Sequence, residues 1–260
     1  LFLVLGAARA PAGAEPGQTT GETPPPSPQA ALMECLKAHT NAAAVLDRNC
    51  IRFTSGGVAE VPFELGSELA GKNELIAKLS ELLASADYRI RRQAADDHFL
   101  FTNEEGETAN IVVVREKLEE NAFTSTFYVD GKRFFGRFEA LIDIRTWGTG
   151  DGKSAYESRV FAYPHNAVWR FVLRLAIIRR YFRARIADIT SASTRVFEIL
   201  ASEPALVLDK MRENAFEDKQ PRFTAEEISK MTEIYARHKL LPAVTGDLQT
   251  PNPDRRKSTS

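Results

Sequence analysis

The chain contains few of the residues from which metal and nucleophile sites are built. It has two cysteines and four histidines among 260 residues. Neither cysteine belongs to a CxxC pair, and no two histidines stand at HxH or HxxxH spacing. Such spacings bring ligands together on one strand or helix, so their absence argues against a zinc or iron site. We therefore expect no metal and no cofactor.

Other motifs of catalysis are missing as well. No GxSxG stands before a helix, so a hydrolase triad has no support. The stretch GTGDGK (148–153) lacks the strand–loop–helix context of a phosphate loop and is interpreted as a hairpin tip. Paired acids fall in predicted turns, where solvated charge is the default: Asp96-Asp97, Glu104-Glu105 and Glu119-Glu120. The sequence favours a protein that is not an enzyme, and its net charge of −1 predicts no nucleic-acid partner.

The chain begins with an apolar run that is too short to span a bilayer. Small residues follow it, and Ala12-Gly13-Ala14 fits a signal-peptidase site. We expect a truncated signal peptide at 1–14, a Pro/Thr-rich linker at 15–29, and an exported protein, periplasmic or extracellular. The alternative is a short apolar N-terminal helix.

Export would permit a disulfide between the two cysteines, Cys35 and Cys50. The bridge would join a helix predicted over 30–49 to the strand after it, and the loop-entropy model gives it about 3 kcal/mol. The alternative is a pair of free, half-buried thiols.

Residues 50–202 contain most of the periodic pattern. Strand material at 50–65 is followed by an amphipathic helix at 73–87, whose leucines form one stripe. Six strand candidates then run from 88 to 163, separated by turn signals too short for crossover helices. They predict an antiparallel meander.

In the longest strand candidate, at 132–147, alternate residues are apolar and the residues between them are mostly polar. The polar parity, predicted to face water, holds Arg137, Glu139, Asp143 and Arg145. A two-residue hairpin loop at Asp130-Gly131 would place Ser125 opposite Gly136, between pairs of phenylalanines. Either the sheet curls there around a core helix, or the small pair leaves room for a ligand; the sequence leaves both open.

An uninterrupted helical segment, or two helices joined by a kink, is predicted from Asn166 to Ser202. A helical extension follows at 203–242 with a capping box from Thr224 to Glu227, and 243–260 is predicted to be disordered. Arginines and aromatics alternate near the start of the long helix. We expect contact with an anionic membrane or a ligand headgroup from six of them: Trp169, Arg170, Arg174, Arg179, Arg180 and Arg183. The alternative is a solvated face that pairs with acids of the sheet.

The order strand, helix, six antiparallel strands, long helix resembles the helix-grip superfamily, which includes START-like lipid-transfer domains, plant allergen-type carriers and aromatic polyketide cyclases. The likeness covers about residues 50–202 and rests on this order and on the passage RVFAYPHNAVWRFVLRLAIIRRYFRARI. It implies an α+β fold in which a curved antiparallel meander of six to seven strands packs on the long C-terminal helix. The family has two short helices after the first strand, and 66–72 would be a stub of one of them.

The resemblance also implies an apolar cavity between sheet and helix, with the arginines at its mouth. Its expected lining is Phe123, Ser125, Phe127, Phe134, Gly136, Phe138, Ala140 and Ile142. Three functions are compatible with this sequence. The first is an exported carrier of a hydrophobic or lipid-like molecule, the second a cyclase- or isomerase-like enzyme, and the third a solid-cored envelope protein. The sequence does not predict the oligomeric state.

Overall fold

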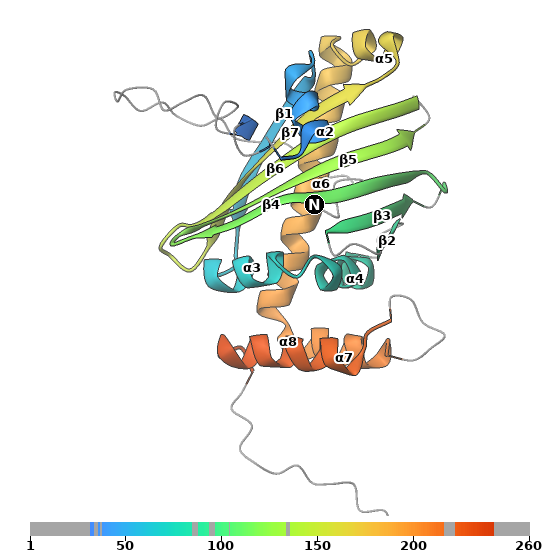
Figure 1. Ribbon diagram of the computed structural model, residues 1–260. Coiled ribbons are helices and arrows are strands. Elements are labelled where there is room, and N and C mark those ends of the chain that lie inside the picture. Colours follow the sequence, from blue (N-terminus) through green and yellow to red (C-terminus); the bar gives the residue numbers. More distant parts are fainter. Residues whose placement is uncertain are drawn as a thin grey trace, which may run out of the picture.

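A seven-stranded antiparallel sheet with helices on both faces forms the molecule (Figure 1). The computed structural model describes residues 32–33, 36, 38–84, 88–93, 97–103, 105–133, 136–215 and 222–241. The predicted signal peptide, linker and tail, together with Cys35 and Phe134, lie outside these residues. The pairing of Cys35 with Cys50 therefore stays a prediction.

The strand order is β1-β7-β6-β5-β4-β3-β2, and the sheet does not close, so β1 and β2 are its edges. The strands are β1 (Ile51–Ala59), β2 (Tyr88–Arg92), β3 (His98–Asn103), β4 (Thr108–Glu119), β5 (Ala122–Arg133), β6 (Gly136–Gly148) and β7 (Ser154–Pro164). From β2 to β7 each strand pairs with its successor, because the connections are hairpin turns. This confirms the predicted meander, and β1 returns to pair with β7.

Two short helices follow β1, so the segment 66–72 belongs mainly to a complete helix and is no stub. The helices are α2 (Thr40–Asp47), α3 (Phe63–Ala70), α4 (Asn73–Ala84), α5 (Ala167–Val172), α6 (Ala176–Ser202), α7 (Pro204–Glu213) and α8 (Ala225–Arg237). The long helix α6 crosses one face of the sheet, while α3 and α4 lie along one end of it (Figure 1). The α+β, helix-grip type of fold is confirmed, with additional helices before and after it.

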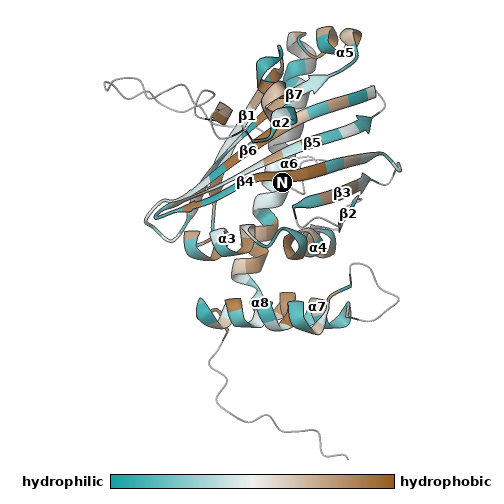
Figure 2. Cartoon of the chain, viewed as in Figure 1, coloured by the Kyte–Doolittle hydropathy of each residue, from teal (hydrophilic) through white to brown (hydrophobic). Residues whose placement is uncertain are grey.

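The main core lies between the sheet and helices α3, α4, α6, α7 and α8. One parity of each long strand points into it, as Phe127 and Val129 of β5 and Ala140 and Ile142 of β6 do. Helix α4 buries Leu79 from the other side. Helices α7 and α8 each carry both hydrophobic and hydrophilic residues, as amphipathic helices do (Figure 2), and bury residues such as Met211 and Tyr235. Apolar burial of this kind is the main stabilising contribution to the fold.

The second face of the sheet is not simply a solvent-facing surface, and here the prediction was wrong. Helix α2 packs on it and forms a second cluster with Tyr128, Leu141 and Phe161. Glu139, predicted to face water, is buried under this helix, whereas Arg137 and Arg145 are exposed. Alternation separates the two faces of a strand, but it does not say what covers each face.

The β5–β6 hairpin turns four residues later than predicted. Arg133 pairs with Gly136, so Asp130 and Gly131 lie inside β5, and Ser125 faces Ile144. The guanidinium of Arg137 donates to both carboxylate oxygens of Asp130, at 3.0 and 2.8 Å. This two-point pairing stabilises the observed register.

Gly131 and Gly136 have different roles in this hairpin. A Cβ on Gly131 would lie 2.7 Å from Cβ of Ala109 and 2.9 Å from Cε1 of Phe138, so the glycine permits a close approach. Gly136 has φ +96° and no neighbour where its Cβ would be. Gly136 therefore serves the turn, and neither helix packing nor a ligand cavity explains it.

The helical segment after the sheet is divided into two helices, α5 and α6, which confirms one of the two predicted alternatives. Asn166 caps α5 by accepting from the backbone N–H groups of Val168 and Trp169. Leu173, in the connection between α5 and α6, is buried in the main core, and no proline or glycine stands at the break. Thr224 and Glu227 form the predicted capping box at the start of α8.

Candidate functional site

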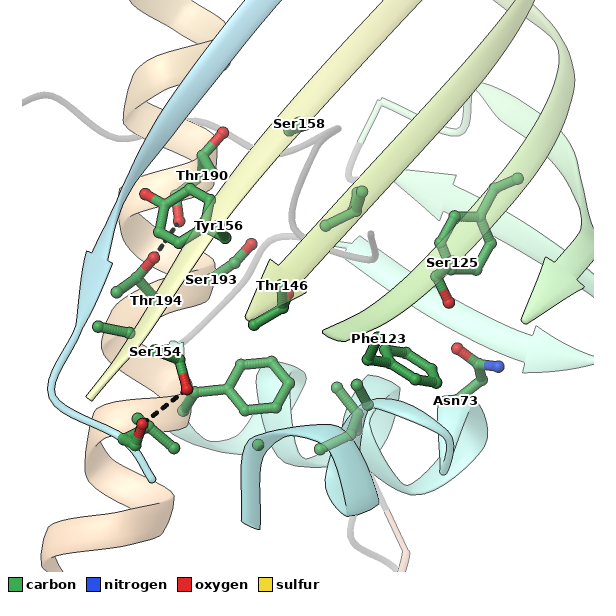
Figure 3. A pocket seen from close by; sticks show the side chains of 18 residues that line it. Asn73, Phe123, Ser125, Thr146, Ser154, Tyr156, Ser158, Thr190, Ser193 and Thr194 are labelled. Carbon is green, nitrogen blue, oxygen red and sulfur yellow. Dashed lines mark hydrogen bonds between the residues drawn. The ribbon is translucent and has the colours of Figure 1, made fainter. Parts of the chain in front are cut away.

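A cavity of about 140 Å³ lies between the sheet and the middle of α6 (Figure 3). It is at the end of the sheet where β5 and β7 begin and β1 and β6 end. Helices α3 and α4 contribute Gly66, Ala70 and Ile76 to its lining. The cavity is partly open to solvent, so a small molecule has a route into it.

Apolar side chains form much of the cavity wall. Phe123, Phe127 and Ile144 come from the sheet, and Phe197 comes from α6. Phe123 and Phe127 are buried. Aromatic and aliphatic walls with a few polar groups are typical of small-molecule sites.

Eight hydroxyl groups complete the lining. They belong to Ser125, Thr146, Ser154, Tyr156, Ser158, Thr190, Ser193 and Thr194 (Figure 3). Strands supply the first five and α6 supplies the last three. Within the described part of the chain, the residues that line the cavity include an amide, Asn73, but no Asp, Glu, His, Lys or Arg. The lining is therefore polar in places and uncharged.

Several of these hydroxyls already have partners. Ser154 Oγ donates to the carbonyl oxygen of Val61 at 2.8 Å, and Thr194 Oγ1 donates to the carbonyl oxygen of Thr190 at 2.9 Å. Ser125 Oγ donates to Oε1 of Glu116 at 3.3 Å, at the cavity edge. By contrast, Ser158 is 1% exposed, and its Oγ has no hydrogen-bond partner in the described part of the chain.

The structure brings together some of the residues expected to line a cavity and separates the others. Phe123, Ser125 and Phe127 line the cavity. Phe138, Ala140 and Ile142 share the face but belong to the packed core farther along β6. Gly136 lies at the turn. The lining residues of β7 and α6 were not predicted from the sequence. For α6, the run of small residues from Thr190 to Thr194 was a signal.

None of the six residues predicted at the cavity mouth is among the described residues that line the cavity. Helix α5 follows the opposite end of β7, and the eleven residues of that strand span roughly 33 Å. Arg170 stacks on Tyr163 and donates to its hydroxyl at 2.9 Å. The other four arginines of the predicted set are exposed: Arg174, Arg179, Arg180 and Arg183. Arg174 reaches back to the carbonyl oxygen of Asn49 at 3.1 Å.

A polar cluster lies under α2, on the other face of the sheet. Tyr128 donates to Oε1 of Glu139 at 2.8 Å, His165 Nε2 lies 3.0 Å from Oε2, and Arg48 pairs with the same Oε2. Burial alone would raise the pKa of Glu139, but the hydrogen bond from Tyr128 and the charge of Arg48 outweigh it and lower that pKa. Burial and the neighbouring carboxylate raise the pKa of Tyr128, which keeps the phenol a donor. The cluster ties α2 to the sheet.

Two features are absent from the described part of the chain. None of the helices in that part of the chain is long and apolar enough to cross a membrane. No group of three or more His, Cys, Asp or Glu side chains there could hold a metal ion.

No family model matches the chain, and no curated protein matches it. Several solved structures align with part of the chain. A conserved protein from Geobacillus kaustophilus aligns with TM-score 0.43 and 8% identity over 56% of this chain and 95% of its own. A hypothetical protein from Helicobacter pylori aligns with TM-score 0.41 and 8% identity over 56% and 86% of the two chains. The protein Ara h 8.0201 aligns with TM-score 0.36 and 14% identity over 55% and 99%. These likenesses carry no functional assignment.

Proposed function

We propose that the protein binds a small hydrophobic molecule in the cavity between the sheet and α6. The observation that carries this proposal is the cavity itself, with its aromatic walls and uncharged hydroxyls. A space of about 140 Å³ suits a single ring or the end of an acyl chain, since an apolar cavity of about 150 Å³ holds benzene. The ligand is therefore smaller than a whole lipid.

The rival functions have less support. A cyclase or isomerase needs an acid and a base beside its substrate, and the described residues that line this cavity include no Asp, Glu, His, Lys or Arg for that role. A solid-cored envelope protein would not need a cavity of this size between its sheet and its long helix. The START-like or cyclase-like relationship, and export to the periplasm or the cell exterior, are part of our proposal and rest on the sequence pattern.

Binding of toluene, followed by ligand-observed NMR on the full chain, tests the proposal. A dissociation constant on the order of 1 mM corresponds to about −4 kcal/mol, an ordinary yield for seven heavy atoms. Ser193→Leu should fill the cavity and weaken binding at least tenfold. Ser191→Leu is the matched control, because Ser191 is exposed on the same helix. If the parent protein gives no saturable toluene binding, the proposal is wrong.

A second function, contact with an anionic membrane, is favoured by the surface of α5. Val168 and Phe171 are 67% and 66% exposed, and Leu175 is 46% exposed just after the helix. Exposed arginines follow on α6, and no acid interrupts the segment from Ala167 to Ala187. Interfacial helices combine apolar side chains, which insert into the membrane surface, with basic side chains, which contact the lipid phosphates. We propose that this end of the molecule rests on such a surface.

Vesicle sedimentation tests the membrane contact. The parent protein should bind vesicles that contain phosphatidylglycerol and not vesicles of phosphatidylcholine alone. Arg180→Gln with Arg183→Gln should weaken binding, because each basic residue near an anionic surface contributes about 1 kcal/mol. Phe171→Ser should weaken it as well, whereas Leu118→Ser, at an equally exposed position on β4, should not. Equal binding by the Phe171 and Leu118 variants would exclude α5 as the contact.

A further inference from the structure

Ser158 differs from Ser125, Ser154 and Thr194, the cavity hydroxyls whose hydrogen-bond partners are given above. It lines the cavity from β7, where its strand partners are Ile144 of β6 and Ser55 of β1; Figure 3 labels its position. It is almost fully buried, and its oxygen has no partner within the described residues. A buried hydroxyl without a partner costs free energy, so such groups are rare in native proteins and call for an explanation.

The residues around Ser158 define what could satisfy it. The backbone of β7 is paired on both sides, so the hydroxyl is free to donate or accept toward the cavity. Another serine on the same face of β7, Ser154, already donates to the carbonyl oxygen of Val61. No charged side chain is among the described residues that line the space, and the nearby Glu116 carboxylate already accepts from Ser125 and Asn73, so a charged ligand would lack a counter-ion of its own.

We infer that Ser158 is the polar anchor of the ligand site, and that the natural ligand is a neutral, ring-sized molecule with one hydroxyl or carbonyl group. This inference rests on the proposed function and specifies its ligand. The ring lies against Phe123, Phe127 and Phe197, and the polar group forms a hydrogen bond with Ser158 Oγ.

The site should therefore discriminate between ligands of the same shape. Phenol and toluene differ by a hydroxyl in place of a methyl group. A site that forms a hydrogen bond with its ligand binds an analogue that lacks the hydrogen-bonding group more weakly. The ratio of the two affinities, measured with each protein variant, cancels the difference in hydration between the two probes.

Ser158→Ala and Ser154→Ala form a matched pair, because both positions lie on the same face of β7 and both line the cavity. Ser158→Ala should lower the phenol-to-toluene affinity ratio about five- to tenfold, the loss expected for one net hydrogen bond. Ser154→Ala should leave the ratio unchanged. The denaturation midpoint should respond in the opposite way: unchanged or higher in Ser158→Ala, and lower in Ser154→Ala, which leaves the Val61 carbonyl without its donor.

The outcomes separate this inference from the proposed function. If toluene and phenol both bind and Ser158→Ala leaves their ratio unchanged, the cavity binds ligands but Ser158 does not anchor them. A ratio that falls equally in both serine variants would overturn the inference as well, since it would show a general change of the cavity. If the parent protein binds neither probe, the proposed function itself fails.

Discussion

Removal of the Tyr128 hydroxyl tests how α2 is held on the sheet. Tyr128→Phe keeps the ring in the cluster with Leu141 and Phe161 and removes only the donor to Glu139. The side chain of Glu139 is 8% exposed, so water has little access to the oxygen that loses its partner. Arg48 and His165 both lie at the other oxygen of the carboxylate and do not replace the lost donor.

The expected cost follows from this geometry. A hydrogen bond to a charged group contributes about 1.5–3 kcal/mol, and here the acceptor stays buried. For a domain of this size 1 kcal/mol corresponds to about 2–4 °C in Tm. Tyr128→Phe should therefore lower the Tm at pH 7 by roughly 3–12 °C, measured by circular dichroism.

The difference should also depend on pH. The pKa of Glu139 is lowered in the folded protein, so the stability that its ionised form contributes is present above the unfolded pKa, about 4.3. That contribution is lost as pH falls through the lower folded pKa. The gap in Tm between the parent protein and Tyr128→Phe should be full at pH 7 and should narrow below about pH 4.

Tyr156→Phe is the control, because that hydroxyl lies over Gly57 beside the cavity and away from Glu139. It should change the Tm little at any pH. A Tm for Tyr128→Phe within 1 °C of the parent at pH 7 would refute the reasoning. So would a gap that stays constant down to pH 3, because the carboxylate would then have no part in it.

Three further changes probe features that the sequence left open. Gly131→Ala should lower the free energy of unfolding by about 1–3 kcal/mol in a urea titration, since its Cβ would collide with Ala109 and Phe138; a neutral result would show that the strands can separate there. Gly136→Ala should cost about 1–2 kcal/mol from its positive φ alone, and Gly136→Asn should recover part of that loss; equal losses in both would point to a cause other than φ. Thr224→Ala removes the α8 cap and should cost about 1 kcal/mol, with Thr232→Ala, inside the helix, as the smaller comparison.

The sequence predicted the order and type of the elements but not the register of the central hairpin. The true turn and the predicted one differ by four residues, and an even shift leaves the same side chains on the same face. Hydrophobic alternation therefore cannot distinguish them. The choice depends on contacts across the strands, such as the two-point pairing of Arg137 with Asp130 and the fit of Phe138 against Gly131.

The polar face was misjudged for a related reason. The pattern of β6 shows Glu139 among charged residues, and nothing in the strand itself says that α2 will cover it. A charge is buried there because Tyr128, His165 and Arg48 come from three separate parts of the chain. Their convergence is a property of the tertiary structure and has no local signal.

Part of the candidate site was predictable. Phe123, Ser125 and Phe127 are inward residues of one strand, so alternation alone identifies them. Ser158 is also on the inward parity of its strand, but a serine in that position is no signal until its surroundings are known. The residues of α6 that face the cavity depend on how that helix crosses the sheet, which helical periodicity does not give.

The open sheet has a consequence for the behaviour of the protein at high concentration. A free edge offers unpaired backbone groups to the edge of a neighbouring molecule and invites aggregation. At one end of this sheet the edge strand β2 has only five residues and exposes Arg89, Arg91 and Arg92. Two such edges repel each other before their backbones can pair. We expect the arginines of β2 to oppose edge-to-edge pairing between copies of the chain, a role separate from any ligand.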